Sequence, residues 1–219
     1  MALAPDIVVV QELRQRQAIE LSAMLRERYP YQDLHPGVDA EGMGVFSRYP
    51  LETTALYRLD DASNPVQVLS VRASDQVFWV INMHARISRL ITRRILGLCL
   101  PSGLCSGARR DDVRHIRDVV SELPNPAILL GDMNTTCECA PYCLIPPEWH
   151  NVHETVGHGW SLTYPVAASF FGVRPPFPLF RIDHIFVRGT WRPLAIRAGQ
   201  IPGSDHRYLI ADLTLPPSE

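Results

Sequence analysis

Acidic, amide or histidine side chains lie at or just beyond the ends of several short apolar segments of this chain, and this pattern limits the possible folds more than any other feature. The polar groups are Gln11-Glu12, Asn82 with His84, Asp132 with Asn134, and the pairs Asp183-His184 and Asp205-His206. A short continuous apolar run rich in β-branched side chains is typical of a strand buried on both faces. Strand ends lie where a rigid sheet meets solvent, so polar side chains from different strands can converge there. The pattern therefore predicts a buried sheet with a polar site along one edge.

The segments around these polar groups predict a mixed α/β domain. Residues 14–29 have apolar side chains at helical spacing and are followed by Pro30, and residues 109–123 also carry an apolar helical face. The runs 66–73 and 76–85 predict a β-hairpin, and further strands are expected at 7–10, 42–51, 126–134, 181–189 and 208–215. Residues 87–107 predict some helix followed by a loop, and residues 137–180 predict mostly loop. Alternating strands and helices without an interdomain linker indicate one layered α/β domain over residues 1–219.

The composition is that of a globular protein with an apolar core. Apolar residues make up 46% of the chain and charged residues 20%, and the net charge is −2. Such a charge gives no overall attraction to a polyanion, so nucleic-acid binding would need a local basic patch. No apolar run approaches the ~20 residues of a membrane span, and no signal-peptide pattern is present. As it stands, the sequence predicts a cytoplasmic protein.

The five cysteines do not indicate a metal site. An odd number of cysteines without a secretory signal favours reduced thiols. Three of them lie in "CECAPYC" (137–143), and this spacing lacks the paired C-x₂-C of most structural zinc sites. A disulfide or plain loop cysteines fit the segment better than a zinc knuckle.

The polar groups at the strand ends are of the types that phosphoester hydrolysis requires. Hard cations such as Mg²⁺ take oxygen ligands and keep several waters, so one or two carboxylates are sufficient. Phosphoryl chemistry also needs a positioned water, a base and donors that face the phosphate oxygens. Each group alone has a simpler explanation: Glu12 as a solvated strand end, His84 as a satisfied histidine, "GDMN" as a turn. Their order along the chain favours a shared site.

In that order, "VVVQE", "GVFSRYPL", "INMHA", "LLGDMN", "RIDHIF" and "GSDH" resemble the successive motifs of the endonuclease/exonuclease/phosphatase superfamily. The resemblance extends from residue 6 to residue 214. It implies a four-layer αββα sandwich, in which two packed mixed β-sheets are flanked by helices and the site lies at one end. It also implies a Mg²⁺-dependent phosphoesterase, with Mn²⁺ as a substitute.

The resemblance implies a metal side and a phosphate side of this site. Glu12 resembles the principal Mg²⁺ ligand of the family, and Asp205 would assist with the metal or with water.

On the phosphate side, His206 resembles the histidine that acts as a base or faces the phosphate, and Asp183 resembles the acid that hydrogen-bonds its imidazole. Asp132 would orient or deprotonate the attacking water. Asn134 would hold a phosphate oxygen, and His84 would face the phosphate or the leaving group.

The chain departs from the family in one respect. Members normally begin with a strand that bears an Asn, some way before the "QE" strand. Here eleven residues precede Glu12, and the first Asn of the chain is Asn64. We therefore expect the first strand to be missing, with unpaired ladder groups on its neighbours. If this reflects a truncated N-terminus, the whole protein would be membrane-associated.

The segment 161–186 gives a hypothesis for the substrate. It is similar to the same region in the bacterial branch of glycopeptide-antibiotic-resistance type membrane phosphoesterases. Four phenylalanines beside a phosphoester site would suit a lipid-linked phosphate, although they could equally cover the sheet. They are Phe170, Phe171, Phe177 and Phe180.

Two alternatives remain open from the sequence. A nuclease would need a basic groove, which arginines after His84 could supply: Arg86, Arg89, Arg93, Arg94, Arg109 and Arg110. All 21 basic residues are arginine, and this residue type favours bidentate phosphate contacts. The second alternative is an inactive binding domain that has lost activity with its first strand.

Overall fold

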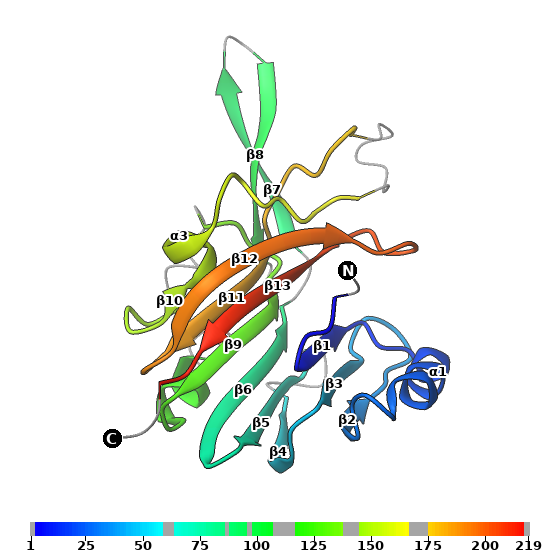
Figure 1. Ribbon diagram of the computed structural model, residues 1–219. Coiled ribbons are helices and arrows are strands. Elements are labelled where there is room, and N and C mark those ends of the chain that lie inside the picture. Colours follow the sequence, from blue (N-terminus) through cyan, green and yellow to red (C-terminus); the bar gives the residue numbers. More distant parts are fainter. Residues whose placement is uncertain are drawn as a thin grey trace.

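The computed structural model describes residues 3–58, 64–85, 88–95, 98–106, 117–137, 145–166 and 175–216 (Figure 1). The strands are β1 (Ile7–Gln11), β2 (Tyr31–His35), β3 (Met43–Ser47), β4 (Leu51–Tyr57), β5 (Val66–Ala73), β6 (Gln76–His84), β7 (Ser88–Ile95), β8 (Leu98–Ser106), β9 (Ala127–Asp132), β10 (His150–Asn151), β11 (Asp183–Arg188), β12 (Arg192–Gln200) and β13 (Arg207–Thr214). The helices are α1 (Gln15–Leu25) and α3 (Val152–Val156), and residues 117–122 are also helical.

A six-stranded sheet forms the centre of the molecule. Its strand order is β10-β11-β9-β6-β5-β4, and all neighbours are antiparallel except β6 and β9, which are parallel. Both faces of its central strands are covered, which is why these strands are continuous apolar runs rather than alternating ones. Val80 and Ile81, adjacent on β6, are both almost fully buried and belong to different core clusters. The mixed α/β architecture predicted from the sequence is confirmed.

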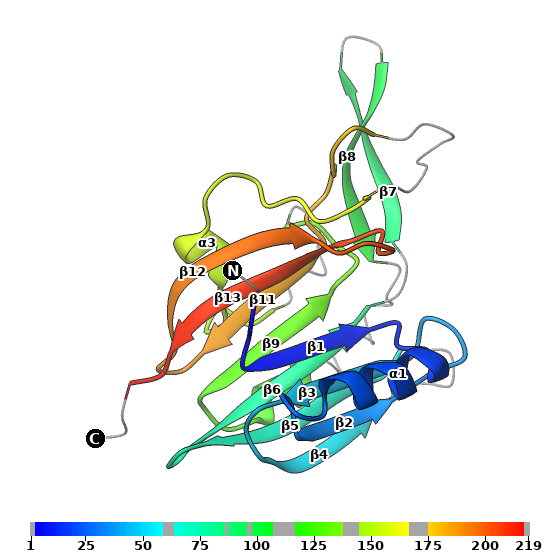
Figure 2. The same ribbon diagram turned by 45° about the vertical axis from the view of Figure 1, so that its right-hand side comes forward.

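A second layer covers one face of this sheet and consists of two separate sheets. One has the order β1-β3-β2, and the other pairs β12 with β13. Both lie over the same face of the six-stranded sheet, and α1 lies outside β2 and β3 (Figures 1 and 2). Apolar side chains of β1 and β13, among them Val9 and Leu209, pack on the same core cluster as Val80.

The opposite face of the six-stranded sheet is covered by the helical residues 117–122 and the segment 145–149. Val120 and Trp149 are buried there against Phe186 of β11. The guanidinium of Arg188 lies over the Trp149 ring, 4.7 Å from its centroid, and donates to the carbonyls of Val120 and Leu123. These layers together form the predicted sandwich.

The prediction for residues 87–107 was wrong. The described part of this segment is a long antiparallel hairpin, β7–β8, which projects from the body of the molecule (Figures 1 and 2). Its base packs on the rest of the fold through Leu104, which is buried with Phe180 and Ile182. Pro101 and Gly103 were taken as loop residues, but Pro101 lies at a register shift and Gly103 is pressed against Thr136. Proline is tolerated in a strand at a bulge, and glycine is tolerated where the backbone lies close to a neighbouring group.

Besides β7 and β8, four of the described strands were not predicted, namely β2, β4, β10 and β12. Their side chains are mostly half-buried or exposed, so they lack the continuous apolar run that identifies a central strand. Several predicted features lie outside the described residues: Phe170, Phe171, Arg86, Arg109, Arg110, the start of the helix at 109–123, and Cys139 and Cys143 of the cysteine cluster. Among the described residues, no helix combines the length and apolar character needed to cross a membrane.

Candidate functional site

Three strands of the central sheet bring their polar ends to one place. The register of the parallel pair β6 and β9 aligns His84 with Asp132, and the antiparallel pair β9 and β11 aligns Asp132 with Asp183. The three residues therefore lie side by side on neighbouring strands. His206 directly precedes β13, which packs over this part of the sheet.

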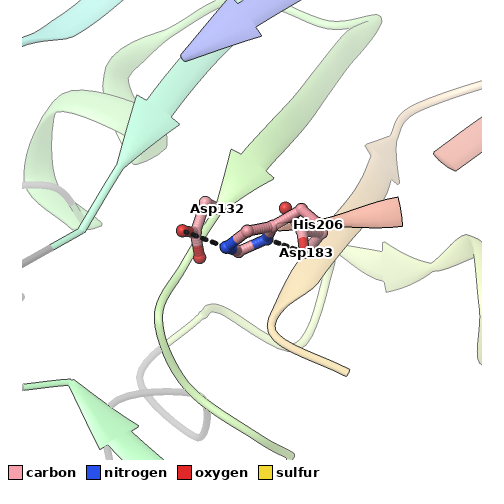
Figure 3. A group of neighbouring side chains, drawn as sticks. All are labelled: Asp132, Asp183 and His206. Atoms are coloured by element: carbon pink, nitrogen blue, oxygen red, sulfur yellow. Dashed lines mark hydrogen bonds and ion pairs between the residues drawn. The ribbon is translucent and has the colours of Figure 1, made fainter. Parts of the chain in front are cut away.

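His206 lies between two carboxylates (Figure 3). Its Nδ1 is 2.8 Å from Oδ2 of Asp183, and because a carboxylate oxygen accepts, the ring N–H donates. Its Nε2 is 3.9 Å from Oδ2 of Asp132 on the other side. Asp132, Asp183 and His206 each offer one ligand atom, and these atoms lie within 4.8 Å of one another. Asp183 thereby fixes the orientation of the imidazole.

The two acids and the imidazole change one another's proton affinity. Burial lowers the pKa of His206, but the hydrogen bond to Asp183 and the negative charges of Asp183, Asp132 and Asp205 outweigh burial and raise it to about 9. Burial, together with the negative charge of Asp183, raises the pKa of Asp132 to about 8. Proton affinities raised in this way are typical of functional sites.

His84 joins Glu12 to the same group. Its Nδ1 is 3.0 Å from the carbonyl oxygen of Ala40, so this nitrogen carries the proton of the neutral ring. Burial lowers the pKa of His84, which favours the neutral form. The Nε2 lone pair then faces Oε1 of Glu12 at 3.8 Å and Oδ2 of Asp132 at 3.6 Å. Acceptor atoms that face one another in this way need a proton or a cation between them. A group of ligands made up mainly of oxygen atoms suits a hard divalent ion.

Asn134 supports Asp132. The backbone N–H of Asn134 donates to Oδ1 of Asp132 at 2.7 Å, and its side-chain amide donates to Oδ2 at 3.2 Å and to the carbonyl of Ala85 at 2.9 Å. Asn134 has φ of 48°, in the left-handed region that Asn tolerates better than most residues. A contact between this amide and a phosphate oxygen would compete with these bonds, and that role stays a prediction.

Glu12 and Asp205, the two residues expected to bind the metal, differ in their positions. The Glu12 side chain is 60% exposed and lies at the edge of the acidic group. Asp205 is exposed, and its backbone carbonyl accepts from the N–H of Val166 at 2.6 Å. Its carboxylate raises the pKa of His206 but is not among the three clustered ligand atoms. The metal-binding role of both residues remains a prediction.

Tyr164 was not predicted at the site, and His184, named among the polar strand ends, was given no role there. The ring of Tyr164 contacts the ring of His206 with centroids 4.8 Å apart, and its backbone pairs with Phe180. Tyr164 lies in a loop-like segment, so no strand-end pattern marks it. His184 is buried behind Asp183, and its Nε2 is 2.9 Å from the carbonyl oxygen of Thr135. The Asp-His pair in the sequence indicates a polar strand end at this position, but it does not predict that the His184 ring points into the core, which depends on the packing of the sheet.

Two of the four phenylalanines expected near the substrate can be placed. Phe177 is 58% exposed, whereas Phe180 is buried in the core at the base of the β7–β8 hairpin. Phe180 therefore covers the fold, as the simpler interpretation expected, and Phe177 is accessible to a ligand.

Comparison with known proteins gives a match over nearly the whole chain. The sequence model of the Endonuclease/Exonuclease/phosphatase family matches residues 2–206. Among curated proteins, none has a sequence similar enough to count as a match.

Solved structures share the fold at low sequence identity. The D. rerio TDP2 in complex with a single-strand DNA product has 17% identity and a TM-score of 0.71, over 96% of this chain and 86% of that one. An endonuclease/exonuclease/phosphatase from Bacteroides vulgatus has 20% identity and a TM-score of 0.67, over 96% and 85%. A mannosyl-6-phosphatase from Bacteroides thetaiotaomicron has 16% identity and a TM-score of 0.62, over 96% and 85%. At these identities the structures establish the fold alone.

Proposed function

The chain belongs to the Endonuclease/Exonuclease/phosphatase family, whose members hydrolyse phosphoester bonds, and from this premise we propose that it is a Mg²⁺-dependent phosphodiesterase or phosphatase whose site is the group around Asp132. The observation that carries the proposal is the arrangement of Asp132, Asp183 and His206, with ligand atoms within 4.8 Å of one another. Mn²⁺ is expected to substitute for Mg²⁺.

The residues present fit a divalent cation. Glu12, Asp132 and His84 direct acceptor atoms toward one another. Burial and the negative charge of Asp183 raise the pKa of Asp132, although the charge of His206 opposes this rise. We propose that Glu12 holds the ion, that Asp205 assists with the metal or with water, and that Asp132 orients the attacking water. A divalent cation at this place would polarise the phosphate oxygens and offset the charge that develops on them.

We assign the proton transfers to Asp132 and His206, the two groups at the site whose pKa values are raised. A water oxygen attacks phosphorus, and its proton passes to the carboxylate of Asp132, whose raised pKa makes it a stronger base than an ordinary carboxylate. The bond between phosphorus and the ester oxygen breaks, and the leaving oxygen takes a proton from His206 or from water. Because the pKa of His206 is raised to about 9, its imidazole is protonated at pH 7 and faces the phosphate as a donor. Asp183 holds the ring in place for this step.

Two classes of phosphoester are candidate substrates. A lipid-linked phosphate is the first candidate, on the apolar character of the segment 161–186, in which Phe177 is exposed. The likeness to the D. rerio TDP2, whose structure contains single-strand DNA, supports a nuclease as the second candidate. Hydrolysis of prenyl pyrophosphate and phospholipid, compared with cleavage of plasmid DNA, separates the two.

The proposal is tested with a generic phosphodiester. Hydrolysis of bis-p-nitrophenyl phosphate should require Mg²⁺ and stop when EDTA is added. His206→Ala should lower kcat/KM by about 100-fold or more, since it removes a proton donor at the reacting group. Asp205→Ala should lower it less, because this side chain lies at the exposed edge of the site.

The matched control is Asp212→Asn, an exposed aspartate of β13 that pairs with Arg197 at 3.3 Å. It should retain wild-type activity and a wild-type melting temperature. Wild-type protein that binds Mg²⁺ but turns over no phosphoester would identify an inactive binding domain and overturn the proposal.

A further inference from the structure

The backbone at Glu12 is held in an unfavourable conformation. Its φ is 56°, in the left-handed region that is rare for residues other than Gly, Asn and Asp. Such a conformation persists only where the surroundings impose it. On the C-terminal side, the N–H of Leu13 donates to the carbonyl of Gly42 at 3.0 Å, and the carbonyl of Leu13 accepts from Gly37. Leu13 is also almost fully buried, so this side of Glu12 is fixed.

On the N-terminal side, Glu12 is fixed through the side chain of Gln11. The Nε2 of Gln11 donates to Oδ1 of Asn82 at 2.7 Å. Asn82 in turn donates to Oε1 of Gln67, its cross-strand partner on β5, at 3.1 Å. Gln67 donates to both the carboxylate and the backbone carbonyl of Asp33 on β2, at 2.8 Å and 3.0 Å. The side chains of Asn82 and Gln67 are fully buried between the two layers.

Asp33 sets the direction of this whole chain of amides. Its carboxylate and its carbonyl can only accept, so Gln67 must present its NH₂ group to them. The oxygen of Gln67 then faces Asn82 and accepts from it. The oxygen of Asn82 is left to accept from Gln11, so the orientation of the Gln11 amide is fixed from the far side of the layer. Each amide in the chain has a buried partner that would be costly to leave unpaired.

We infer that Gln11 and Asn82 are positioning residues that hold Glu12 in place for the cation. The inference rests on the proposed function, because it takes Glu12 as a ligand of the ion. Neither residue touches the reacting atoms. Removing the amide of either should release the strained turn at Glu12 and weaken metal binding, as loss of an outer-shell partner does.

The test measures metal affinity by Mn²⁺ electron paramagnetic resonance and by Mg²⁺ calorimetry. Asn82→Leu replaces the amide by an apolar side chain of similar size. Gln11→Met does the same at a half-buried position, where the change should destabilise the folded protein less. The control is Val80→Ala, a core truncation on the same strand and face that lies two residues before Asn82. Asn82→Leu and Gln11→Met should bind the ion about 10-fold more weakly or worse, whereas Val80→Ala should stay within twofold of wild type.

Hydrogen exchange of the Leu13 amide gives a readout that needs neither metal nor activity. In metal-free protein, this amide should exchange at least several-fold faster in Asn82→Leu and Gln11→Met than in Val80→Ala, after correction for the loss in melting temperature. If the wild-type protein shows no metal-dependent hydrolysis, the proposed function is refuted. The exchange rate of the Leu13 amide would still decide whether Gln11 and Asn82 hold the turn at Glu12. Metal affinity and Leu13 exchange that match those of Val80→Ala would overturn the inference.

Discussion

At the scale of single residues, the site depends on how His206 is enclosed. Asp183 accepts from one ring nitrogen, Asp132 faces the other, and Tyr164 covers part of the ring. Two carboxylates beside one imidazole stabilise its charged form more than burial destabilises it. The imidazole is therefore a cation near neutral pH in the absence of metal.

Asp183→Asn tests this account of His206. The substitution keeps a hydrogen-bond acceptor but removes the charge, so the pKa of His206 should fall from about 9 by about 1–2 units. The titration is followed in metal-free protein by long-range ¹H–¹⁵N spectra of labelled histidines, with the His206 signal assigned from its absence in His206→Ala. Asp212→Asn should leave the midpoint unchanged. An unaltered midpoint in Asp183→Asn would mean that Asp183 does not control the charge of this ring.

The sequence predicted which residue types reach the site, but not all of their positions. Asp132 and Asp183 could be expected to meet because both follow or begin an apolar strand. Asp205 and His206 lie in a bend just before β13, where the structure exposes Asp205 and half-buries His206, and no local pattern predicts this division. Tyr164 was missed because its place against His206 depends on backbone pairing with Phe180, which no local pattern encodes.

At the scale of elements, β11 carries a functional and a structural residue in succession. Asp183 faces the site, while His184 is buried on the other side of the strand and holds the Thr135 carbonyl, just beyond Asn134. Burial lowers the pKa of His184 to about 4, because its effect, with a smaller one from the charge of Arg181, outweighs the opposing hydrogen bond to Thr135. The neutral ring is therefore part of the folded state.

His184 should make the fold sensitive to acid. A folded-state pKa of about 4 against an ordinary value of 6.5 means that stability is fully present above pH 6.5 and is lost as the pH falls toward 4. The loss should reach about 3 kcal/mol of unfolding free energy. His184→Gln keeps a donor for Thr135 without a titrating group, so its stability should change less over this range in urea unfolding at pH 4 to 7. The exposed His150→Gln is the control, and a wild-type pH slope in His184→Gln would contradict the prediction.

The strands that could be predicted are those with a pronounced apolar run. β1, β6 and β9 were expected for this reason, whereas β12 alternates between half-buried and exposed side chains and was missed. The β7–β8 hairpin was misassigned because Pro101 and Gly103 are usual loop residues. Here the hairpin tolerates them through a shift in register and a close contact at Thr136.

At the scale of the whole molecule, one intact sheet supports a second layer that is divided. The sheet β1-β3-β2 and the pair β12-β13 are joined to the central sheet by apolar packing, and no described strand pairs with the free edge of β1 or of β13. Among the described strands, β1 is therefore an edge strand. Glu12 lies at its end, and the buried amides beside it provide a restraint that a second ladder would otherwise supply. The missing first strand expected from the sequence stays a prediction.

The free edge of β1 can be tested by hydrogen exchange. The N–H of Arg48 donates to the carbonyl of Asp6, and β1 and β3 continue from this pair in antiparallel register. Closely bonded pairs alternate in such a ladder, so the amides of Val8 and Val10 donate to β3, whereas those of Ile7 and Val9 face away from it. Ile7 and Val9 should therefore exchange at least 100-fold faster than Val8 and Val10, as ladder bonds are the main protection of a strand amide. Equal protection of all four amides, at protein concentrations low enough to exclude self-association, would show that another segment pairs with β1 and completes the layer.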